Sequence, residues 1–347
     1  MASSTIHPTV ASSWLRSPNF DLTFIGLPLI LALLSGIAVV THPHLFYFIL
    51  MVDLWILGYH HVISTYTRLC FDKKSYQQHK FLILYLPFIV FAATIALAFS
   101  FGIWLIFTIY LYWQWFHYTR QSWGISQVYR RKSNGTVSES LWVTQAAFYL
   151  LPFWGIVYRS WQAPEKFLGT KIWVIPTPEF LVYLTGIAAI GSILIWGYQR
   201  IRAFAQGQGS VPHTLYMLSH WCIFGTGYLL IEDITFGWLV INIWHNAQYI
   251  FFVWLFNTNR FKNGIDDKAR FLSMISQPKM WWAYLVVCLA ITTILYTGLN
   301  SSKEIFLALG IPSMIVIYQT INFHHYIVDA LIWKARKKPM QKTMGLS

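Results

Sequence analysis

The chain has 347 residues, of which 56% are hydrophobic and only 11% are charged, whereas a soluble domain carries about 25% charged residues. Apolar stretches long enough to cross a bilayer recur along the chain, as is typical of transmembrane helices. The formal net charge of +13 would suit a nucleic-acid-binding protein. However, the basic residues lie in short segments between apolar stretches, as in the loops of membrane proteins. Composition therefore favours an all-α polytopic transmembrane helix bundle whose partner is the lipid bilayer, and argues against a nucleic-acid partner.

Ten candidate spans follow one another along the chain. They cover residues 22–41, 45–64, 81–99, 101–118, 141–158, 179–198, 213–231, 236–256, 281–298 and 305–333. No small-residue cleavage site follows the first span, so we interpret it as a retained helix and not a signal peptide. The last is long enough to project beyond the bilayer or to kink at Pro312. We expect one integral-membrane domain over 1–347, with a short N-terminal segment, 1–21, and a basic tail, 334–347.

The basic residues divide sharply between the two sides of this topology. All but four of the 25 Lys and Arg residues fall in the N-terminal segment, in the tail and after the second, fourth, sixth and eighth spans. The positive-inside rule therefore predicts that both termini are cytoplasmic. We expect a multi-pass protein, in a bacterial inner membrane.

Histidines are concentrated inside the predicted spans. Seven of the twelve histidines lie in apolar segments, in the contexts G-Y-H-H, W-F-H-Y, S-H-W, W-H-N and F-H-H-Y. An ionisable residue inside a span is costly, so it is a candidate functional residue. With a rise of 1.5 Å per residue, most of these histidines lie roughly 10–16 Å from the cytoplasmic boundary. Five segments therefore present histidine at a similar depth in one leaflet.

This convergence predicts a metal centre with its active site toward the cytoplasm. Imidazole is the commonest metal ligand and suits iron, zinc and copper. Seven imidazoles exceed the four ligands of a structural zinc site and suggest two metal ions. The candidate ligands are His60, His61, His117, His213, His220, His245, His324, His325 and Asp329.

Carboxylates and amides near these histidines extend the candidate site. Asp329 follows His325 by four residues, so it shares a helix face with that imidazole and could be a ligand or orient one. Asp53 lies about 10 Å from His60 along one helix face, which favours an outer supporting position. Asn242 and Asn322 are further candidates for contacts behind the ligands.

The pattern resembles the histidine-rich integral-membrane non-haem iron enzymes, which include desaturases, alkane and sterol hydroxylases and the Brp/Blh-type carotenoid oxygenases. The segment Leu57-Gly-Tyr-His-His-Val is similar to the Gly-x-Pro-His motif of the Brp/Blh type without its proline. The desaturase boxes H-x3-4-H and H-x2-3-H-H are absent from the sequence. The resemblance implies two irons, O2, an electron donor and a hydrophobic small-molecule substrate that is hydroxylated, desaturated or cleaved.

Two other classes of protein remain open at this point. A haem protein for electron transfer or oxidation would use facing histidines on neighbouring helices. A metal or proton transporter would also place ionisable residues inside its spans, although no internal repeat is evident.

Overall fold

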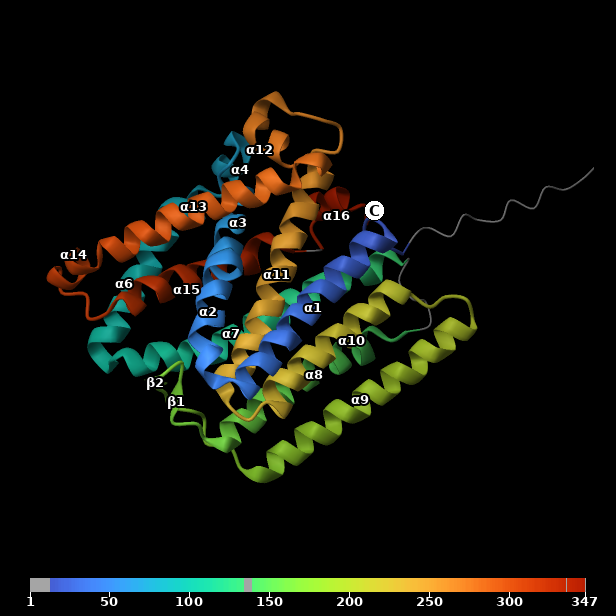
Figure 1. The fold of residues 1–347 in the computed structure, drawn as a ribbon. Helices are drawn as coiled ribbons and strands as arrows, with labels where there is room; N and C mark the ends of the chain where they lie inside the picture. The colour runs from blue at the N-terminus through green and yellow to red at the C-terminus, as the bar shows by residue number, and fades with distance from the viewer. Residues whose placement is uncertain (1–12, 134–138, 335, 347) are drawn as a thin grey trace, which may run out of the picture.

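The structure, a computed structural model, describes residues 13–133, 139–334 and 336–346. Residues 1–12 of the expected N-terminal segment, and residues 335 and 347 of the expected tail, lie outside this part. The described chain is almost entirely helical, in agreement with the all-α prediction (Figure 1). The two strands, β1 (Lys166–Phe167) and β2 (Thr170–Lys171), form a short antiparallel hairpin.

The helices of the N-terminal half are interrupted by short turns. They are α1 (Pro18–Thr41), the 3-10 turn η1 (Pro43–Leu45), α2 (Phe46–Asp53), the π-helical turn η2 (Leu54–Gly58), α3 (Tyr59–Leu69), α4 (Lys73–Gln78), α5 (Lys80–Leu84), α6 (Leu86–Phe101), α7 (Ile103–Lys132) and α8 (Leu141–Gln162). Gly102, with φ of +91°, separates α6 from α7 in a conformation that favours glycine.

The C-terminal half contains a second series of long helices. They are α9 (Glu179–Ala205), α10 (Val211–Gly225), the π-helical turn η3 (Thr226–Leu230), α11 (Ile234–Arg260), η4 (Asp267–Ala269), α12 (Arg270–Ile275), η5 (Pro278–Met280), α13 (Trp281–Ser301), α14 (Lys303–Ala308), α15 (Met314–Ile332) and α16 (Lys338–Met344). Polar caps define several starts: the side chains of Ser210, Asp233 and Ser313 accept backbone N–H groups at the first turns of α10, α11 and α15.

Within the described residues, six helical stretches are long and apolar enough to cross a membrane. They are Pro18–Thr41, Pro43–Cys70, Leu141–Gln162, Glu179–Ala205, Ile234–Arg260 and Pro278–Ser301. The other four predicted spans correspond to α6, α7, α10 with η3, and α14 with α15. Helix α6 has only 16 residues, and α7, α10 and α15 interrupt their apolar sequence with histidine and other polar side chains. The count of ten spans is therefore not confirmed.

The last predicted span differs from the expected continuous helix. The chain leaves the helical conformation between α14 and α15, around Pro312, and Gly310 adopts a φ of +85°. Proline lacks an N–H and clashes with the preceding helical turn. The expected kink is thus a complete break, after which Ser313 caps α15 afresh.

Helix α11 occupies the centre of the bundle. In its most apolar window 89% of the residues are buried, whereas in the other five candidate spans the share is between 28% and 39%. Helices α1, α8, α9 and α10 run side by side in Figure 1, and α11 and the α2–α3 segment cross them more steeply. Helix α11 contacts α1, α3, α10 and α16, so side chains from distant parts of the sequence meet around it.

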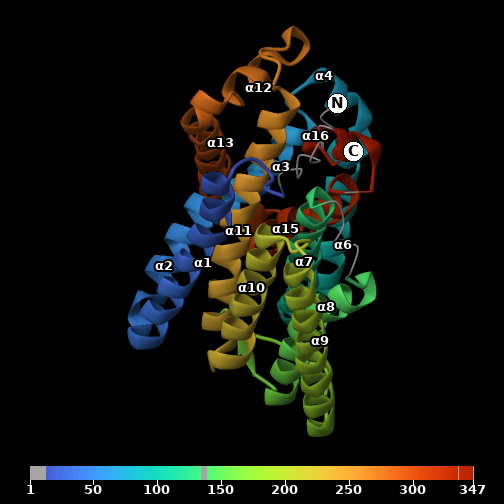
Figure 2. The ribbon, with the colours of Figure 1, turned by 90° about the vertical axis from the view of Figure 1, so that its right-hand side faces the viewer.

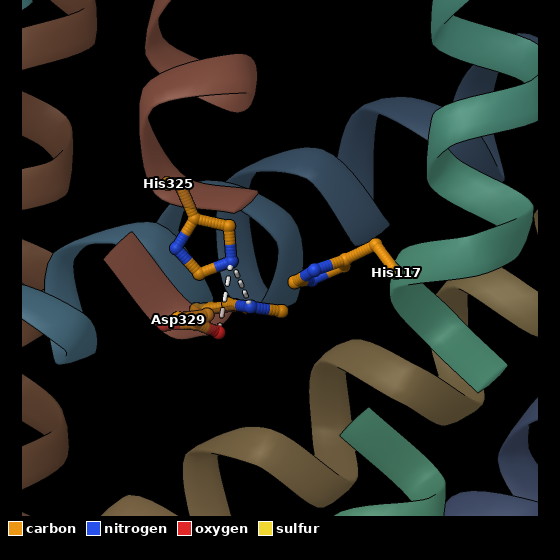
Figure 3. Close-up of side chains that lie close together, drawn as sticks. His117, His325 and Asp329 are labelled. Atoms are coloured by element: carbon orange, nitrogen blue, oxygen red, sulfur yellow. Dashed lines mark hydrogen bonds and ion pairs between the residues drawn. The ribbon is translucent and has the colours of Figure 1, made fainter. Parts of the chain in front are cut away.

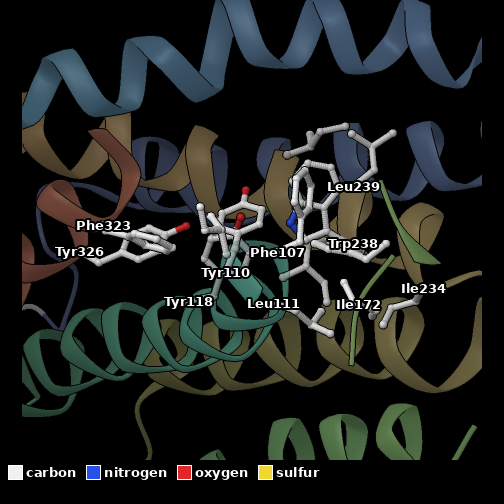
Figure 4. Packing of buried hydrophobic residues seen from close by; sticks show 14 of the residues in the cluster. Phe107, Tyr110, Leu111, Tyr118, Ile172, Ile234, Trp238, Leu239, Phe323 and Tyr326 are labelled. Carbon is white, nitrogen blue, oxygen red and sulfur yellow. The ribbon is translucent and has the colours of Figure 1, made fainter. Parts of the chain in front are cut away.

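Small residues allow α11 to approach η3, the π-helical turn that follows α10, closely. A Cβ atom on Gly237 would lie 1.9 Å from the carbonyl oxygen of Gly227, so the two backbones are in direct contact. Close backbone approach at small residues is a common way for membrane helices to associate. Beside this contact, Trp238 and Leu239 of α11 pack with Tyr110 and Leu111 of α7 in the main hydrophobic cluster (Figure 4).

The two ends of the described chain lie together. Leu15, before α1, shares a hydrophobic cluster with Met340 and Met344 of α16, and Phe20 and Leu346 pack against it. Figure 2 accordingly shows α16 at the same end of the bundle as α4 and α12. The expected basic tail is therefore partly an ordered helix docked on α11.

Candidate metal centre

Three helices bring potential metal ligands to one buried point. His61 of α3, His117 of α7, and His325 and Asp329 of α15 each offer a ligand atom, and these four atoms lie within 4.8 Å of one another. All four side chains are buried. Figure 3 shows His117 reaching from α7 toward the pair formed by His325 and Asp329. The spacing of four residues within α15 places these two on one face, and Nε2 of His325 lies 3.4 Å from Oδ2 of Asp329.

A hydrogen-bond chain determines which nitrogen of His61 carries the proton. Nδ2 of Asn246 faces a carboxyl oxygen of Asp53 at 3.5 Å, so Oδ1 of Asn246 faces His61. That amide oxygen can only accept, and it lies 2.8 Å from Nδ1 of His61. The proton of His61 is therefore on Nδ1, and Nε2 presents its lone pair to the cluster.

The hydroxyls of Thr65 and Tyr249 determine which nitrogen of His325 carries the proton. The hydroxyl of Tyr249 donates to Oδ1 of Asp329 at 2.8 Å, so its contact with Thr65, at 2.7 Å, uses the proton of Thr65. The oxygen of Thr65 then accepts from Nδ1 of His325, 3.1 Å away. His325 is consequently protonated on Nδ1, and its Nε2 also presents a lone pair. Trp333 completes the chain by donating to the Tyr249 hydroxyl at 2.7 Å.

Nε2 of His61 and Nε2 of His325 are 2.8 Å apart, although neither carries the proton needed for a hydrogen bond between them. Two lone pairs and a carboxylate oxygen therefore point at one another in a buried space. Such an arrangement is repulsive unless a cation lies among the three atoms. With metal–nitrogen bonds of about 2.0–2.1 Å, two ligands at a tetrahedral angle stand about 3.3 Å apart. A small separation of the two rings would thus accommodate an ion.

His117 and His245 supply further unsatisfied nitrogens. Nε2 of each is buried without a hydrogen-bond partner. The ring centre of His245, on α11, lies 4.8 Å from that of His61 and 5.1 Å from that of His117. The ring of His117 stacks on Tyr326 with 4.2 Å between ring centres, which holds it in place. Unpaired buried polar atoms are costly, so these two nitrogens fit an additional ligand position.

A carboxylate lies behind the imidazoles. Asp53 accepts from Nδ2 of Asn242 at 2.6 Å and also contacts Asn246, which holds His61. The hydroxyl of Tyr118 donates to Oδ1 of Asn242. Partners of this kind orient metal-bound histidines and strengthen them as ligands. Asp53 thus connects Asn242 to Asn246, the amide that holds His61.

Two small cavities flank the cluster. One, of about 50 Å³, is lined by His61, His245, His325 and Asn322 among others. The other, of about 80 Å³, is lined by His117, Asp329, Arg120 and Met340. Tyr326 lines both cavities. A third, larger cavity of about 440 Å³ shares the lining residues Leu54, Tyr59, Tyr110 and Asn322 with the first and extends to Leu168 and Gly169 at the β-hairpin.

Four predicted ligands do not join the cluster. His213 lies beside Arg200 and Ser126, at 2.6 and 3.0 Å. His220 contacts Ser122 and the carbonyl of Phe148, and His324 contacts Tyr66 and the carbonyl of Leu82. Both ring nitrogens of these three residues thus have protein partners. His60, which precedes the cluster residue His61, projects to another face of α3, because successive helical residues diverge by about 100°. The expected convergence of all the buried histidines is therefore wrong for these positions.

The sequence interpretation missed the hydroxyl groups and the π-helical turn. Thr65 and Tyr249 decide the orientation of His325, yet isolated hydroxyls in an apolar stretch give no recognisable signal. The π-helical turn η2 directly precedes α3 and changes the direction in which His60 and His61 project. Such turns occur often at functional sites. Gly58, which ends η2, was the available clue, because a Cβ atom there would lie 3.4 Å from Nδ2 of Asn246.

No protein-family description, curated protein or solved structure matches this chain.

Proposed function

We propose that this chain is a membrane-embedded, metal-dependent oxidoreductase, in which His61, His117, His325 and Asp329 hold one iron ion and His245 lies ready as a fifth ligand. Iron bound by imidazole and carboxylate supplies O2 activation. The protein's part is to hold the ligands, exclude water and position a hydrophobic substrate for hydroxylation, desaturation or cleavage. Zinc and copper also fit imidazole ligands, so the choice of iron rests on the resemblance to the histidine-rich membrane enzymes.

The observation that carries this proposal is the pair of Nε2 lone pairs on His61 and His325. They face each other at 2.8 Å, with Oδ2 of Asp329 3.4 Å from one of them. The unpartnered Nε2 atoms of His117 and His245 lie around the same point. Hydrogen bonds alone leave these atoms unsatisfied, whereas a cation would satisfy them together.

One ion suits this set better than the two expected from the sequence. That expectation counted seven imidazoles, of which His220 and His324 are engaged elsewhere and His60 faces another side of α3. A haem fits less well, because the flanking cavities of about 50 and 80 Å³ are far smaller than the ~300 Å³ of ordinary cofactor pockets.

The larger cavity is the best candidate for the substrate. It is lined mainly by aromatic and aliphatic side chains, including Phe46, Phe107 and Trp238, and it shares lining residues with the small cavity beside His325. A hydrophobic chain placed there would approach the metal past Tyr59 and Asn322. The reaction further requires electrons from a donor that binds elsewhere.

The proposal includes the full topology expected from the basic residues. We infer that α6, α7, α10 with η3, and α15 cross the membrane alongside the six apolar stretches, giving ten spans with both termini cytoplasmic. The contact of Leu15 with Met340 and Met344, which puts both chain ends at one end of the bundle, supports an even number of spans. We place the protein in a bacterial inner membrane.

Oxygen consumption tests the function. Protein purified after expression with iron should consume O2 when supplied with a chemical reductant and a bacterial lipid extract, and mass spectrometry should detect a modified lipid. The variant His117→Ala should lose this reaction, while His220→Ala, a buried histidine outside the cluster, should retain it. Equal O2 uptake by both variants, or none by the iron-loaded protein with any lipid fraction, contradicts the proposal.

A second candidate is a metal or proton transporter. The two cavities that flank the cluster, both lined by Tyr326, favour it because transported ions need access from two sides. Metal or proton flux into proteoliposomes, lost in His117→Ala and independent of O2, would support this alternative.

A further inference from the structure

A basic cleft lies at the end of the bundle that carries α4 and α16 (Figure 2). It has a volume of about 250 Å³ and is formed by the last turn of α3, by α4, by the last turns of α11 and by α16. Two of the stretches apolar enough to cross a membrane, Pro43–Cys70 and Ile234–Arg260, end at this cleft. A ligand in the cleft would therefore lie at the depth of the lipid headgroups.

Three cationic side chains from three helices line the basic cleft. They are Arg68 of α3, Lys74 of α4 and Arg260 of α11. None of the described residues in the lining is acidic. Asp72, which is buried outside the lining, neutralises one of the three charges through its ion pair with Arg260 at 2.9 Å. The cleft thus keeps two positive charges that its own lining does not neutralise.

Arg68 is held along one wall of the cleft. Its Nη2 donates to the carbonyl oxygen of Ile332 at 3.3 Å. Its guanidinium lies 4.2 Å from the ring centre of Phe256 and 4.6 Å from that of Trp333. Stacking on aromatic rings fixes the planar group, so less conformational entropy is lost when it binds an anion.

Arg260 and Lys74 form the accessible part of the cleft. Nη1 of Arg260 makes both the ion pair with Asp72 and a contact of 3.5 Å with the hydroxyl of Ser75. The guanidinium has five N–H donors, so donors on its other nitrogens are left for a ligand. The side chain of Arg260 is 23% exposed and Lys74 is exposed, so a ligand can reach both.

His79, which also lines the cleft, responds to this concentration of positive charge. Burial is the main cause that lowers its pKa, and the charges of Arg68 and Lys337 lower that pKa further. Nδ1 of His79 donates to the carbonyl oxygen of Ser75 at 2.9 Å, because that oxygen can only accept. The imidazole is thus held in a region whose cations repel another positive charge and attract a negative one.

We propose that the basic cleft binds a phosphate monoester group, carried by a phospholipid headgroup or by a soluble molecule. This group has about two negative charges at pH 7, which match the two positive charges that the lining leaves over. Its three terminal oxygens accept hydrogen bonds from guanidinium and ammonium groups. A phosphate diester has only one negative charge and binds more weakly. Basic pockets at the ends of membrane helices are suited to phospholipid headgroups.

The basic cleft is separate from the metal centre. None of its described lining residues belongs to the cluster of His61, His117, His325 and Asp329. The proposal therefore does not depend on the metal or on the proposed reaction. It predicts the same phosphate binding in protein treated with a chelator.

Isothermal titration calorimetry of the purified full-length protein in detergent tests the proposal with three probes. Dihexanoyl phosphatidic acid carries a phosphate monoester, dihexanoyl phosphatidylcholine has the same chains on a phosphate diester, and glycerol 3-phosphate has the monoester without chains. Phosphatidic acid should bind about tenfold more tightly than phosphatidylcholine, since hydrogen bonds between charged groups contribute roughly this factor. Tighter binding of phosphatidic acid than of glycerol 3-phosphate identifies a lipid ligand, and equal binding identifies a soluble one.

Two neighbouring lysines provide a matched pair of variants. Lys74→Gln should weaken the binding of phosphatidic acid about fivefold, because it removes one partly exposed ion pair. Lys73→Gln should leave the affinity unchanged, because Lys73 is also exposed on α4 but lies outside the lining. Arg260→Gln should weaken binding more than Lys74→Gln.

Three results would overturn the proposal. They are equal affinity for phosphatidic acid and phosphatidylcholine, no binding of either monoester, and the same loss in Lys73→Gln as in Lys74→Gln, which would mean general attraction to a basic surface. If Arg260→Gln does not fold, the comparison of the two lysine variants decides.

Discussion

Nε2 of His61 and Nε2 of His325 lie 2.8 Å apart, and the partners behind each ring leave both nitrogens without a proton. Asn246 holds the proton of His61 on Nδ1, and the Thr65–Tyr249 pair does the same for His325. The two residues are 264 positions apart in the sequence, and come from α3 and α15. A cation between them would make this arrangement favourable, and the following predictions start from that point.

Asn246→Leu should weaken metal binding without removing a ligand. The change deletes the oxygen that keeps the proton of His61 on Nδ1, and losing such a contact typically costs 10–100-fold in metal affinity. Competition with a chromophoric chelator measures the affinity. Asn322→Leu is the control, because Asn322 lines the adjacent cavity but bonds to Gln319. An equal loss in both variants would show that cavity shape, and not the orientation of His61, matters.

Asp329→Asn should lose metal as severely as His325→Ala. Oδ2 of Asp329 faces the cluster, and a neutral amide is a much poorer ligand than a carboxylate. Tyr249→Phe should lose less metal, since its hydroxyl donates to Oδ1, the other carboxylate oxygen. Elemental analysis of the three purified variants provides the comparison. If Asp329→Asn retains nearly all its metal, Asp329 only orients His325.

Gly237→Ala should destabilise the bundle by about 1–3 kcal/mol, because its Cβ would overlap the Gly227 carbonyl and force η3 and α11 apart. Gly225→Ala, also in a helix, has no atom within 4 Å of the added Cβ and should leave stability unchanged or raise it by up to about 1 kcal/mol. Thermal unfolding in detergent compares the two. Similar melting temperatures for both variants would argue against the close helix contact.

Acid should weaken the segment that follows α3. Burial raises the pKa of Asp72, but hydrogen bonds from Arg260 and Ser75 outweigh it and hold that pKa below its ordinary value. Its stabilising contribution is therefore complete above the unfolded-state pKa, near 4, and is lost as the pH falls through the lower folded-state value.

Asp72 stabilises the folded protein through two contacts. Its carboxylate forms an ion pair with Arg260 at 2.9 Å and accepts the N–H of Ser75 at 2.9 Å. Together they should contribute about 1–2 kcal/mol. Asp72→Asn should be less stable than the wild-type protein at pH 7, and the difference should shrink below about pH 4. A difference that persists unchanged at pH 3 would contradict this account.

The sequence predicted the helical class and that several buried histidines come together, because apolar stretches and intramembrane ionisable residues are local signals. It could not separate ligands from packing residues. His61 and His220 look alike in the sequence, yet His220 bonds to Ser122 and a backbone carbonyl. That difference depends on which helices become neighbours in the fold. Even adjacent histidines such as His60 and His61 differ, because they face different sides of one helix.

The similar depth of the histidines in one leaflet did not predict which of them meet. Similar depth in one leaflet is necessary for two histidines to meet, but rotation about the helix axis decides whether they do. The π-helical turn η2 alters that rotation just before His61. The relation between His325 and Asp329 was predictable, because four residues within one helix determine both depth and face.

The metal content of the purified protein tests the central claim most directly. Elemental analysis of wild-type protein, His61→Ala, His325→Ala and the control His324→Ala should give about one metal ion per chain in the wild type and the control, and almost none in the other two. Folded wild-type protein that stays metal-free after iron, zinc and copper are each supplied would contradict the claim. Undiminished metal in both His61→Ala and His325→Ala would do so as well.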